Sequence, residues 1–166
     1  MGGKINWVMI LAVAVLAGLL VGFHEYNRPE RKILRLTRAW MEDWIKIKPE
    51  SPLVQAGKAK RLAGAFDDQF QQDPRPEWPE LPANPDERPA FIFQIRSMME
   101  RLDAAITPPV ITLSPDRRSA QMRTEARVQA DGMGERFDRT YSLRVDWQKT
   151  GHGWRISAIR EAAAEK

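Results

Sequence analysis

Four polar side chains interrupt the apolar stripes of the strands predicted in the second half of the chain. They are Thr124, Arg139, Tyr141 and Arg160. An arginine on an inward stripe must meet an anion or reach an opening, because an unpaired buried charge is costly. A tyrosine hydroxyl beside it can donate a hydrogen bond to a carbonyl. The four residues therefore predict a pocket for an anionic or carbonyl-bearing ligand.

A structural alternative exists for Arg139. Its guanidinium can pair with a carboxylate from a helix, such as Asp67, Asp68 or Asp103, or can extend to solvent at the rim of the pocket. A pocket that is open, with Arg139 free of carboxylates, would favour ligand binding. A pocket filled by the protein's own side chains would favour a protein that acts through its surface.

General acid–base chemistry needs a carboxylate or an imidazole inside the site, and no inward strand position is Asp, Glu or His. The two histidines fall at the predicted membrane edge, His24, and in a turn, His152. Asp67 or Asp103 is the remaining candidate for a base supplied by a helix. No metal-ligand spacing, glycine-rich phosphate loop or nucleophile elbow occurs. The sequence thus predicts no catalytic residue, no metal site and no cofactor.

The overall charge argues against a nucleic-acid partner. Lys and Arg number 26 against 22 Asp and Glu in 166 residues, a formal net charge of +4. This excess is too small to neutralise a phosphate backbone. The chain has no cysteine, which fits a reducing cytosol and equally fits a disulfide-free periplasmic domain.

The N-terminus carries an uncharged apolar run from Ile5 to Phe23. As a helix it would span roughly 28 Å, close to the thickness of a bilayer core. A cleaved signal peptide is the alternative, but the run is longer than a usual signal core and no small-x-small site follows it. Gly18 and Gly22 have the spacing of a helix-packing motif. We expect residues 1–27 to be an uncleaved single-pass anchor, and residues 28–166 to be one domain.

Basic residues follow this run closely: Arg28, Arg31, Lys32, Arg35 and Arg38. They are expected to lie at the membrane surface and contact anionic lipid head groups. Their position favours a cytoplasmic domain, whereas a very short N-terminus favours the opposite side.

Three helices are predicted before the sheet, over residues 29–48, 52–70 and 89–106. In the first, Ile33, Leu36, Trp40, Trp44 and Ile47 form one apolar stripe. Phe66 and Phe70 lie four residues apart in the second, as do Leu102 and Ile106 in the third. Between the second and third helices, residues 71–89 are rich in proline and are expected to form an extended loop.

Strict alternation after residue 110 predicts a curled antiparallel sheet of about four strands. A short strand covers 110–113, and two hairpins follow. Closing the first hairpin around 132–133 pairs Val128 with Phe137, Thr124 with Tyr141 and, outside, Arg127 with Asp138. Closing the second around 150–151 pairs Trp147 with Trp154 and Tyr141 with Arg160. These pairings place apolar residues opposite one another on a single face.

Three helices, long curled strands and the closing hairpin WQKTGHGWRISAIRE resemble the nuclear transport factor 2-like fold, which includes ketosteroid isomerase and SnoaL-type proteins. The resemblance covers roughly residues 29–161. It implies an α+β roll in which the helices and the concave sheet face enclose a cone-shaped pocket. The anchored arrangement resembles inner-membrane assembly proteins of type IV secretion systems, which implies a bacterial inner membrane.

These observations favour a membrane-anchored, non-catalytic interaction or assembly module, with a protein partner or a second copy. The predicted outer sheet face is highly charged, which suits solvent or a polar partner better than a dry dimer interface. The alternative is a small-ligand-binding or vestigial isomerase- or dehydratase-like domain that uses the cone.

Overall fold

The computed structural model describes residues 28–74, 79–132 and 134–162. The predicted anchor, residues 1–27, lies outside this part of the chain. Within the described residues, no helix combines the length and apolarity needed to cross a bilayer. The described helices are α2 (Pro29–Trp44), α3 (Pro52–Ala63), a short 3₁₀ turn η1 (Pro85–Glu87) and α4 (Arg88–Met98).

The described part of the chain forms a sheet of six strands rather than the predicted four, and this sheet is mixed rather than antiparallel. They are β1 (Phe66–Gln72), β2 (Met99–Ile106), β3 (Val110–Leu113), β4 (Ser119–Gly132), β5 (Glu135–Thr150) and β6 (Gly153–Glu161). The order is β1-β6-β5-β4-β2, and β3 also pairs with β4. Only β1 and β6 run parallel among these pairs.

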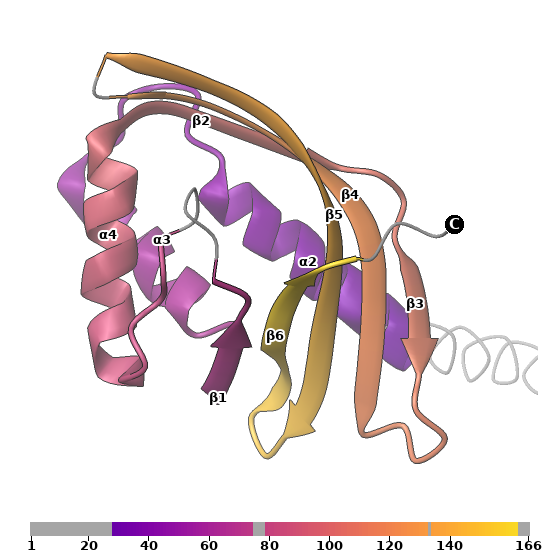
Figure 1. The fold of residues 1–166 in the computed structure, drawn as a ribbon. Helices are drawn as coiled ribbons and strands as arrows, with labels where there is room; N and C mark the ends of the chain where they lie inside the picture. Colours follow the sequence, from indigo (N-terminus) through magenta and orange to yellow (C-terminus); the bar gives the residue numbers. More distant parts are fainter. Residues whose placement is uncertain (1–27, 75–78, 133, 163–166) are drawn as a thin grey trace, which may run out of the picture.

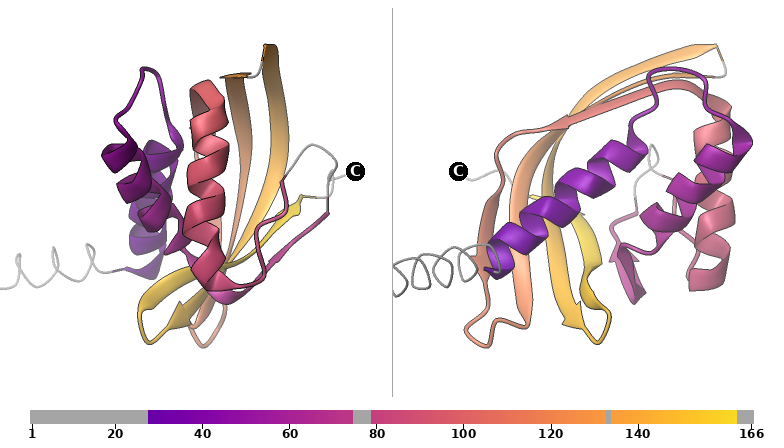
Figure 2. Two further views of the ribbon diagram at one scale, coloured as in Figure 1. Left: turned by 90° about the vertical axis from the view of Figure 1, so that its left-hand side faces the viewer. Right: turned by 180° about the vertical axis from the view of Figure 1, so that it is seen from behind.

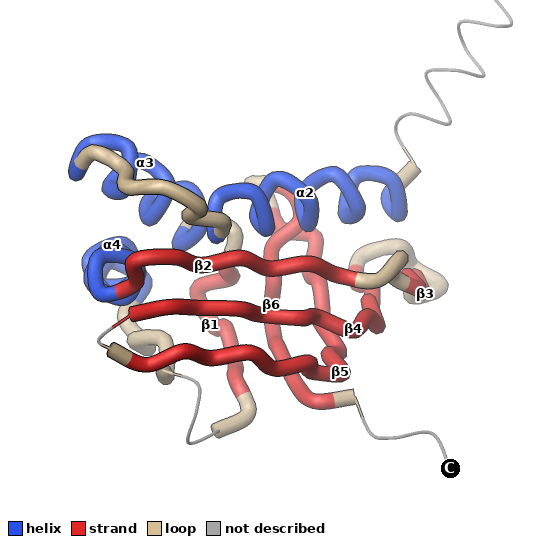
Figure 3. Tube along the Cα trace, turned by 90° about the horizontal axis from the view of Figure 1, so that it is seen from above, coloured by secondary structure: helices blue, strands red, loops and turns tan. Residues whose placement is uncertain are grey.

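The helices cover the concave side of this curled sheet (Figure 1). Helix α2 crosses beneath the arch of β4 and β5, and α3 and α4 lie together at one end (Figure 2). Seen from above, α2 and α3 form one layer beside the long strands (Figure 3). The α+β class and the three helices on a curled sheet therefore agree with the sequence analysis.

Two of the predicted helices end early and continue as strands. Residues 66–72 form β1 and residues 99–106 form β2, where the sequence pattern predicted helix up to residues 70 and 106. Helix α3 begins as expected, with the Ser51 hydroxyl accepting a hydrogen bond from the Val54 amide, and ends at Ala63. The error has a simple cause, since residues four apart share one face of a strand as well as one face of a helix.

The first hairpin, and the second between its turn and Trp147, are shifted by two residues from the predicted register. Gly132 pairs with Glu135, which places Val128 opposite Arg139 and Ala126 opposite Tyr141. An even shift leaves every side chain on its predicted face, so the alternating pattern cannot detect it. The outward ion pair between Arg127 and Asp138 still forms, at 2.8 Å, as a diagonal contact.

A β-bulge in β6 changes the predicted faces at the end of the chain. Trp147 pairs with Ile156 but Asp146 pairs with Ala158, so Ser157 is the extra residue of the bulge, and its hydroxyl donates to the Asp146 carbonyl at 3.1 Å. The predicted pairing of Trp147 with Trp154 is wrong, because Trp154 lies opposite Lys149. Beyond the bulge, residues of β6 exchange faces relative to a regular strand.

The core lies between α2, α3, α4 and the sheet, and its fully buried side chains include Ile33, Leu62, Ile92, Trp147 and Ile156. Leu36 and Ile47, which the helical stripe placed in the core, are 42% and 66% exposed. The buried position on α2 is Thr37 instead, one turn after Ile33. Its hydroxyl donates to the Ile33 carbonyl at 2.9 Å, so its burial leaves no unpaired donor.

Arg88, at the start of α4, is buried although it is charged. Its guanidinium donates to the carbonyls of Asp67 and Asp68 on β1, at 2.6 and 3.0 Å. It also donates to the carbonyls of Pro82 and Ala83 in the preceding loop, at 3.0 and 3.2 Å. One side chain therefore fixes β1, this loop and α4 to each other.

We expect Arg88→Met to lower the free energy of unfolding by about 3 kcal/mol or more, because four carbonyls lose their donor together. Chemical denaturation followed by circular dichroism measures the change. Arg61→Met is the matched control, since Arg61 is exposed and its ion pair with Asp43 lies at the surface. Equal stability of the two variants would contradict the structural role of Arg88.

Candidate functional site

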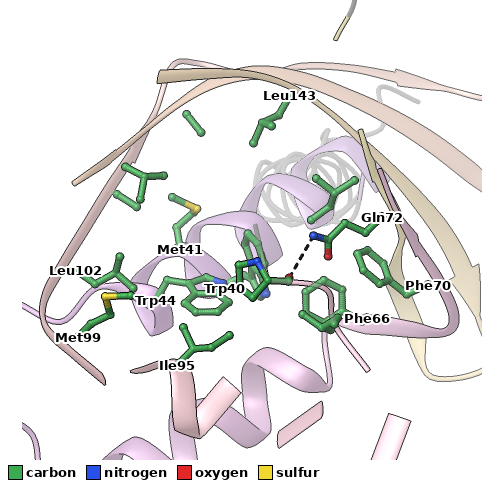
Figure 4. Close-up of a pocket in the computed structure, with 16 residues that line it drawn as sticks. Trp40, Met41, Trp44, Phe66, Phe70, Gln72, Ile95, Met99, Leu102 and Leu143 are labelled. Carbon is green, nitrogen blue, oxygen red and sulfur yellow. Dashed lines mark hydrogen bonds between the residues drawn. The ribbon is translucent and has the colours of Figure 1, made fainter. Parts of the chain in front are cut away.

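The concave face of the sheet and the helices enclose a pocket of about 270 Å³. Its sixteen lining residues come from α2, α4, all the strands except β3, and the loop after β1 (Figure 4). They are Trp40, Met41, Trp44, Phe66, Phe70, Gln72, Pro79, Leu81, Ile95, Met99, Leu102, Ala104, Ala126, Val128, Leu143 and Ile159. None of these side chains is ionisable, so the pocket is an apolar chamber.

Aromatic rings form the floor between α2 and β1. Trp40 meets Trp44 and Phe66 edge-to-face, with ring centroids 6.0 and 5.9 Å apart. Phe66 in turn packs on Phe70 at 4.6 Å. Such contacts fix ring orientations beyond what burial alone achieves. Figure 4 shows these rings together on one side of the pocket and Leu143 on the other.

Gln72 is the polar side chain of the lining. Its amide nitrogen donates to the Pro79 carbonyl at 3.3 Å (dashed line in Figure 4), which joins the end of β1 to the proline-rich loop. The contact places Pro79 and Leu81 against the pocket, so part of the predicted extended loop forms its wall.

Two buried cations position α2 and β2 around the pocket. Arg96 on α4 is fully buried, and its Nη1 donates to the carbonyls of Asp43 and Trp44 at 2.6 and 2.7 Å. The Lys46 ammonium donates to the Met99 carbonyl at 2.5 Å and to the Arg96 carbonyl at 2.9 Å. Trp44 and Met99 both line the pocket. These bonds therefore set the spacing between its helix and strand walls.

Glu50 supplies the counter-charge for this network. Its two carboxylate oxygens accept from Arg96 at 2.6 Å and from Lys58 at 2.7 Å. Burial acts to raise the pKa of Glu50, but the bonds from Lys58 and Arg96 together outweigh it and lower that pKa below its ordinary 4.5. The ionised carboxylate is therefore part of the folded structure.

The lowered pKa of Glu50 predicts how the stability of the protein changes with pH. The contribution of Glu50 to stability is full above about pH 4.5 and is lost as pH falls through its lower folded-state pKa. We expect Glu50→Gln to cost roughly 1–3 kcal/mol at pH 7, and the gap from the parent protein to narrow below pH 4.5. Unfolding curves between pH 3 and 8 test this, with the exposed Glu42→Gln as control. A gap that is constant over this range would refute the assignment.

Two of the four predicted ligand residues lie next to the pocket. Arg139 and Tyr141 share the concave face of β5, opposite the pocket-lining residues Val128 and Ala126. Tyr141 is half-buried, and its ring stacks against Phe137 at 6.3 Å. Arg139 is exposed to solvent, which agrees with an arginine at the rim.

The other two are not available to a ligand there, because the Thr124 hydroxyl is already bonded and Arg160 lies on the other face. Thr124 is buried on the concave face opposite Leu143, and its hydroxyl donates to the Thr107 carbonyl at 2.9 Å. Arg160 lies opposite Arg144 and forms an ion pair with Asp146 on the convex face. The bulge at Ser157 causes this, so the structure does not bring Arg160 to the same place as Arg139.

The carboxylates considered as bases do not line the pocket. Asp67 accepts a hydrogen bond from the Gln69 amide at 3.0 Å, and Asp103 faces away from the pocket, 3.7 Å from Arg101. His152 is exposed in the turn between β5 and β6. Among the described residues, no group of His, Cys, Asp or Glu could hold a metal ion.

The predicted membrane-surface residues all belong to the first half of α2 or precede it. Arg28 is the N-cap position, and Arg31, Lys32, Arg35 and Arg38 follow within the helix. Arg28, Arg31 and Arg38 are exposed, whereas Lys32 and Arg35 are half-buried. The second half of the same helix contributes Trp40, Met41 and Trp44 to the pocket.

Residues 52–160 match a family model described as a SnoaL-like domain. No curated protein matches the chain. Among solved structures, a candidate scytalone dehydratase from Novosphingobium aromaticivorans aligns with a TM-score of 0.58 and 13% identity, over 80% of this chain and 83% of that one.

Two further structures show how widely this fold is used. An NTF2-like protein with a cystatin-like fold, from Novosphingobium aromaticivorans, has a TM-score of 0.55 and 13% identity, and the alignment covers 99% of this chain and 94% of that one. A candidate calcium/calmodulin-dependent protein kinase II association domain from Xanthomonas campestris has a TM-score of 0.57 and 14% identity, over 81% and 89%. At these identities the likeness establishes the fold alone.

Proposed function

Since the chain belongs to the SnoaL-like domain family, we propose that its cone binds a small apolar molecule without transforming it. The observation that carries this proposal is the pocket lining, in which Gln72 is the one amide among sixteen side chains that are otherwise aliphatic, aromatic or thioether. Its volume of about 270 Å³ lies near the lower end of the roughly 300–1,000 Å³ range of small-molecule sites. Burying such a ligand against aliphatic and aromatic groups is favourable by the hydrophobic effect.

The lining also supports a binding role over a catalytic one. General acid–base catalysis needs a titratable group within hydrogen-bond reach of the substrate, and the lining offers none. The open pocket and the exposed Arg139 are the two features that distinguish a ligand-binding cone from a filled one. They favour the alternative function from the sequence analysis over the interaction module.

Two adjacent alanines on β2 provide a matched test. Ala104 lines the pocket, and Ala105 is exposed on the opposite face. We expect Ala104→Phe to fill the pocket and reduce the affinity for a neutral probe, 8-bromooctan-1-ol, at least about tenfold, whereas Ala105→Phe leaves it unchanged. Bromine quenching of the tryptophan fluorescence from Trp40 and Trp44 reports binding.

Failure of the parent protein to bind the probe above the level of Ala104→Phe would contradict a ligand-binding pocket. That result would favour the interaction or assembly module instead. Its candidate surface is the first turn of α3, where Leu53 and Val54 are 84% and 48% exposed.

We also propose that residues 1–27 anchor the domain to a membrane, with the bacterial inner membrane as the expected location. The uncharged run from Ile5 to Phe23 supports this, as does the cluster of basic residues at the start of α2. In this arrangement Arg31 and Arg38, both exposed, contact anionic lipid.

The anchor predicts how the full chain fractionates. We expect the expressed protein to stay in the membrane pellet after an alkaline carbonate wash. Replacing Leu16 and Leu19 by arginine should release it, because each charge near the centre of a span costs roughly 2.5–3.5 kcal/mol. Replacing both by isoleucine is the control and should change nothing. Release of the parent protein by the wash would refute an integral anchor.

A further inference from the structure

We infer that the ligand whose apolar part lies in the pocket also carries a carboxylate, which Arg139 binds at the rim of the pocket. This inference rests on the proposed function, because it takes the apolar part of the ligand to lie in the cone. It adds the chemical class of the ligand, an amphiphilic acid whose tail is buried and whose head group stays near solvent.

The register of β4 and β5 places Arg139 at the rim. It pairs with Val128, which lines the pocket, and its neighbour two residues along, Tyr141, pairs with the lining residue Ala126. Paired residues of antiparallel strands have Cα atoms about 4.5–5.5 Å apart, with their side chains on the same face. The Arg139 side chain therefore starts one strand away from the pocket wall, on the concave side.

Arg139 differs from three arginines of the convex face in having no partner in the part of the chain that the structure describes. Arg127, Arg136 and Arg144 lie within 2.8–3.7 Å of Asp138, Asp131 and Asp146 respectively. Arg139 makes no hydrogen bond or ion pair with any residue between 28 and 162 that the structure describes. Its guanidinium thus keeps all of its donors available at the open side of an apolar chamber.

The neighbouring side chains suit an amphiphile that leaves the pocket at this point. Phe137 and Tyr141 flank Arg139 on the same face, and their rings stack on each other at 6.3 Å. Both are half-buried, so they extend the apolar surface from the pocket to the guanidinium. A ligand tail can lie along these rings while its head group reaches Arg139.

A single guanidinium matches a single negative charge. Its planar fork binds a carboxylate through two parallel N–H···O bonds. A phosphate monoester carries between one and two charges near neutral pH and would need a second cation, which the concave face of β5 does not supply around Arg139. The arrangement therefore favours a carboxylic acid over a phosphate ester.

The test compares two probes of equal length, 8-bromooctanoate and 8-bromooctan-1-ol. They are titrated into the full chain in nanodiscs of zwitterionic lipid, with empty nanodiscs and the Ala104→Phe protein correcting for partition into lipid. We expect the parent protein to bind the acid about fivefold more tightly than the alcohol, the upper range for one partly exposed ion pair.

Arg139→Gln should remove this preference and leave the affinity for the alcohol unchanged. Arg136→Gln, on the opposite face of the same strand, should retain the preference. Equal binding of acid and alcohol by the parent protein, or a preference that survives in Arg139→Gln, would overturn the carboxylate assignment while leaving the apolar pocket intact. Binding of neither probe would instead overturn the proposed function itself.

Discussion

The structure depends on main-chain carbonyls that are gathered around buried guanidinium groups. The helices and the sheet enclose a chamber rather than packing across it, so direct apolar contact cannot fix their separation at that place. Arg88 and Arg96 do this at the perimeter instead, one joining α4 to β1 and the other joining α4 to the end of α2. Each arginine offers five donors in a rigid fork, so several segments can share one side chain. Main-chain carbonyls accept most of these bonds and the Glu50 carboxylate accepts one from Arg96, so the contacts do not depend on which side chains line the chamber.

The burial of these guanidinium groups requires negative charges close to them. A buried cation bonded to neutral carbonyls still needs a nearby anion, because desolvation of the charge is expensive. Glu50 provides it for Arg96, and Lys58 completes the arrangement. Asp67 and Asp68 act on Arg88 both through their carbonyls and through the field of their carboxylates. Residues that looked like candidate bases or surface charges in the sequence thus contribute to the architecture.

The sequence predicts the class of fold and the face of most strand residues, because alternation reports burial directly. The prediction is wrong where a helix and a strand would both place the same residues on one face. Phe66 and Phe70 lie on one side of β1, as they would on one side of a helix, and so do Leu102 and Ile106 on β2. The predicted strand register was wrong for a related reason, since a shift by two residues changes the pairing partners without changing the faces. Turn geometry decides between such registers, and the pair Gly132–Glu135 leaves a two-residue loop that the pattern alone did not specify.

The candidate site was only partly predictable. Arg139 and Tyr141 could be found because polar residues on an apolar stripe stand out, and β5 is regular at that point. The chamber itself could not be predicted, because its walls combine residues from helices, strands and a loop. Each of these residues has the sequence pattern of an ordinary core residue. Trp40 and Trp44 carried a signal as an apolar helical stripe, but nothing in the stripe indicates that a space lies beside it. The predicted face of Arg160 was wrong because the alternating pattern before residue 157 gives no sign of the bulge that follows.

That bulge has a consequence for how such a chamber changes over evolutionary time. Ser157 is one residue more on β6 than the facing stretch of β5 supplies, and the bulge absorbs it, so Ile159 and Arg160 pair with Val145 and Arg144. Loss of that single codon would remove the bulge and leave these pairings in place, with Ile159 still in the wall of the chamber and Arg160 still on the convex face. The last strand can therefore change in length by one residue at this position without a change in the lining of the cone. Within this architecture, a bulge separates the length of a strand from the chemistry of the face that it presents.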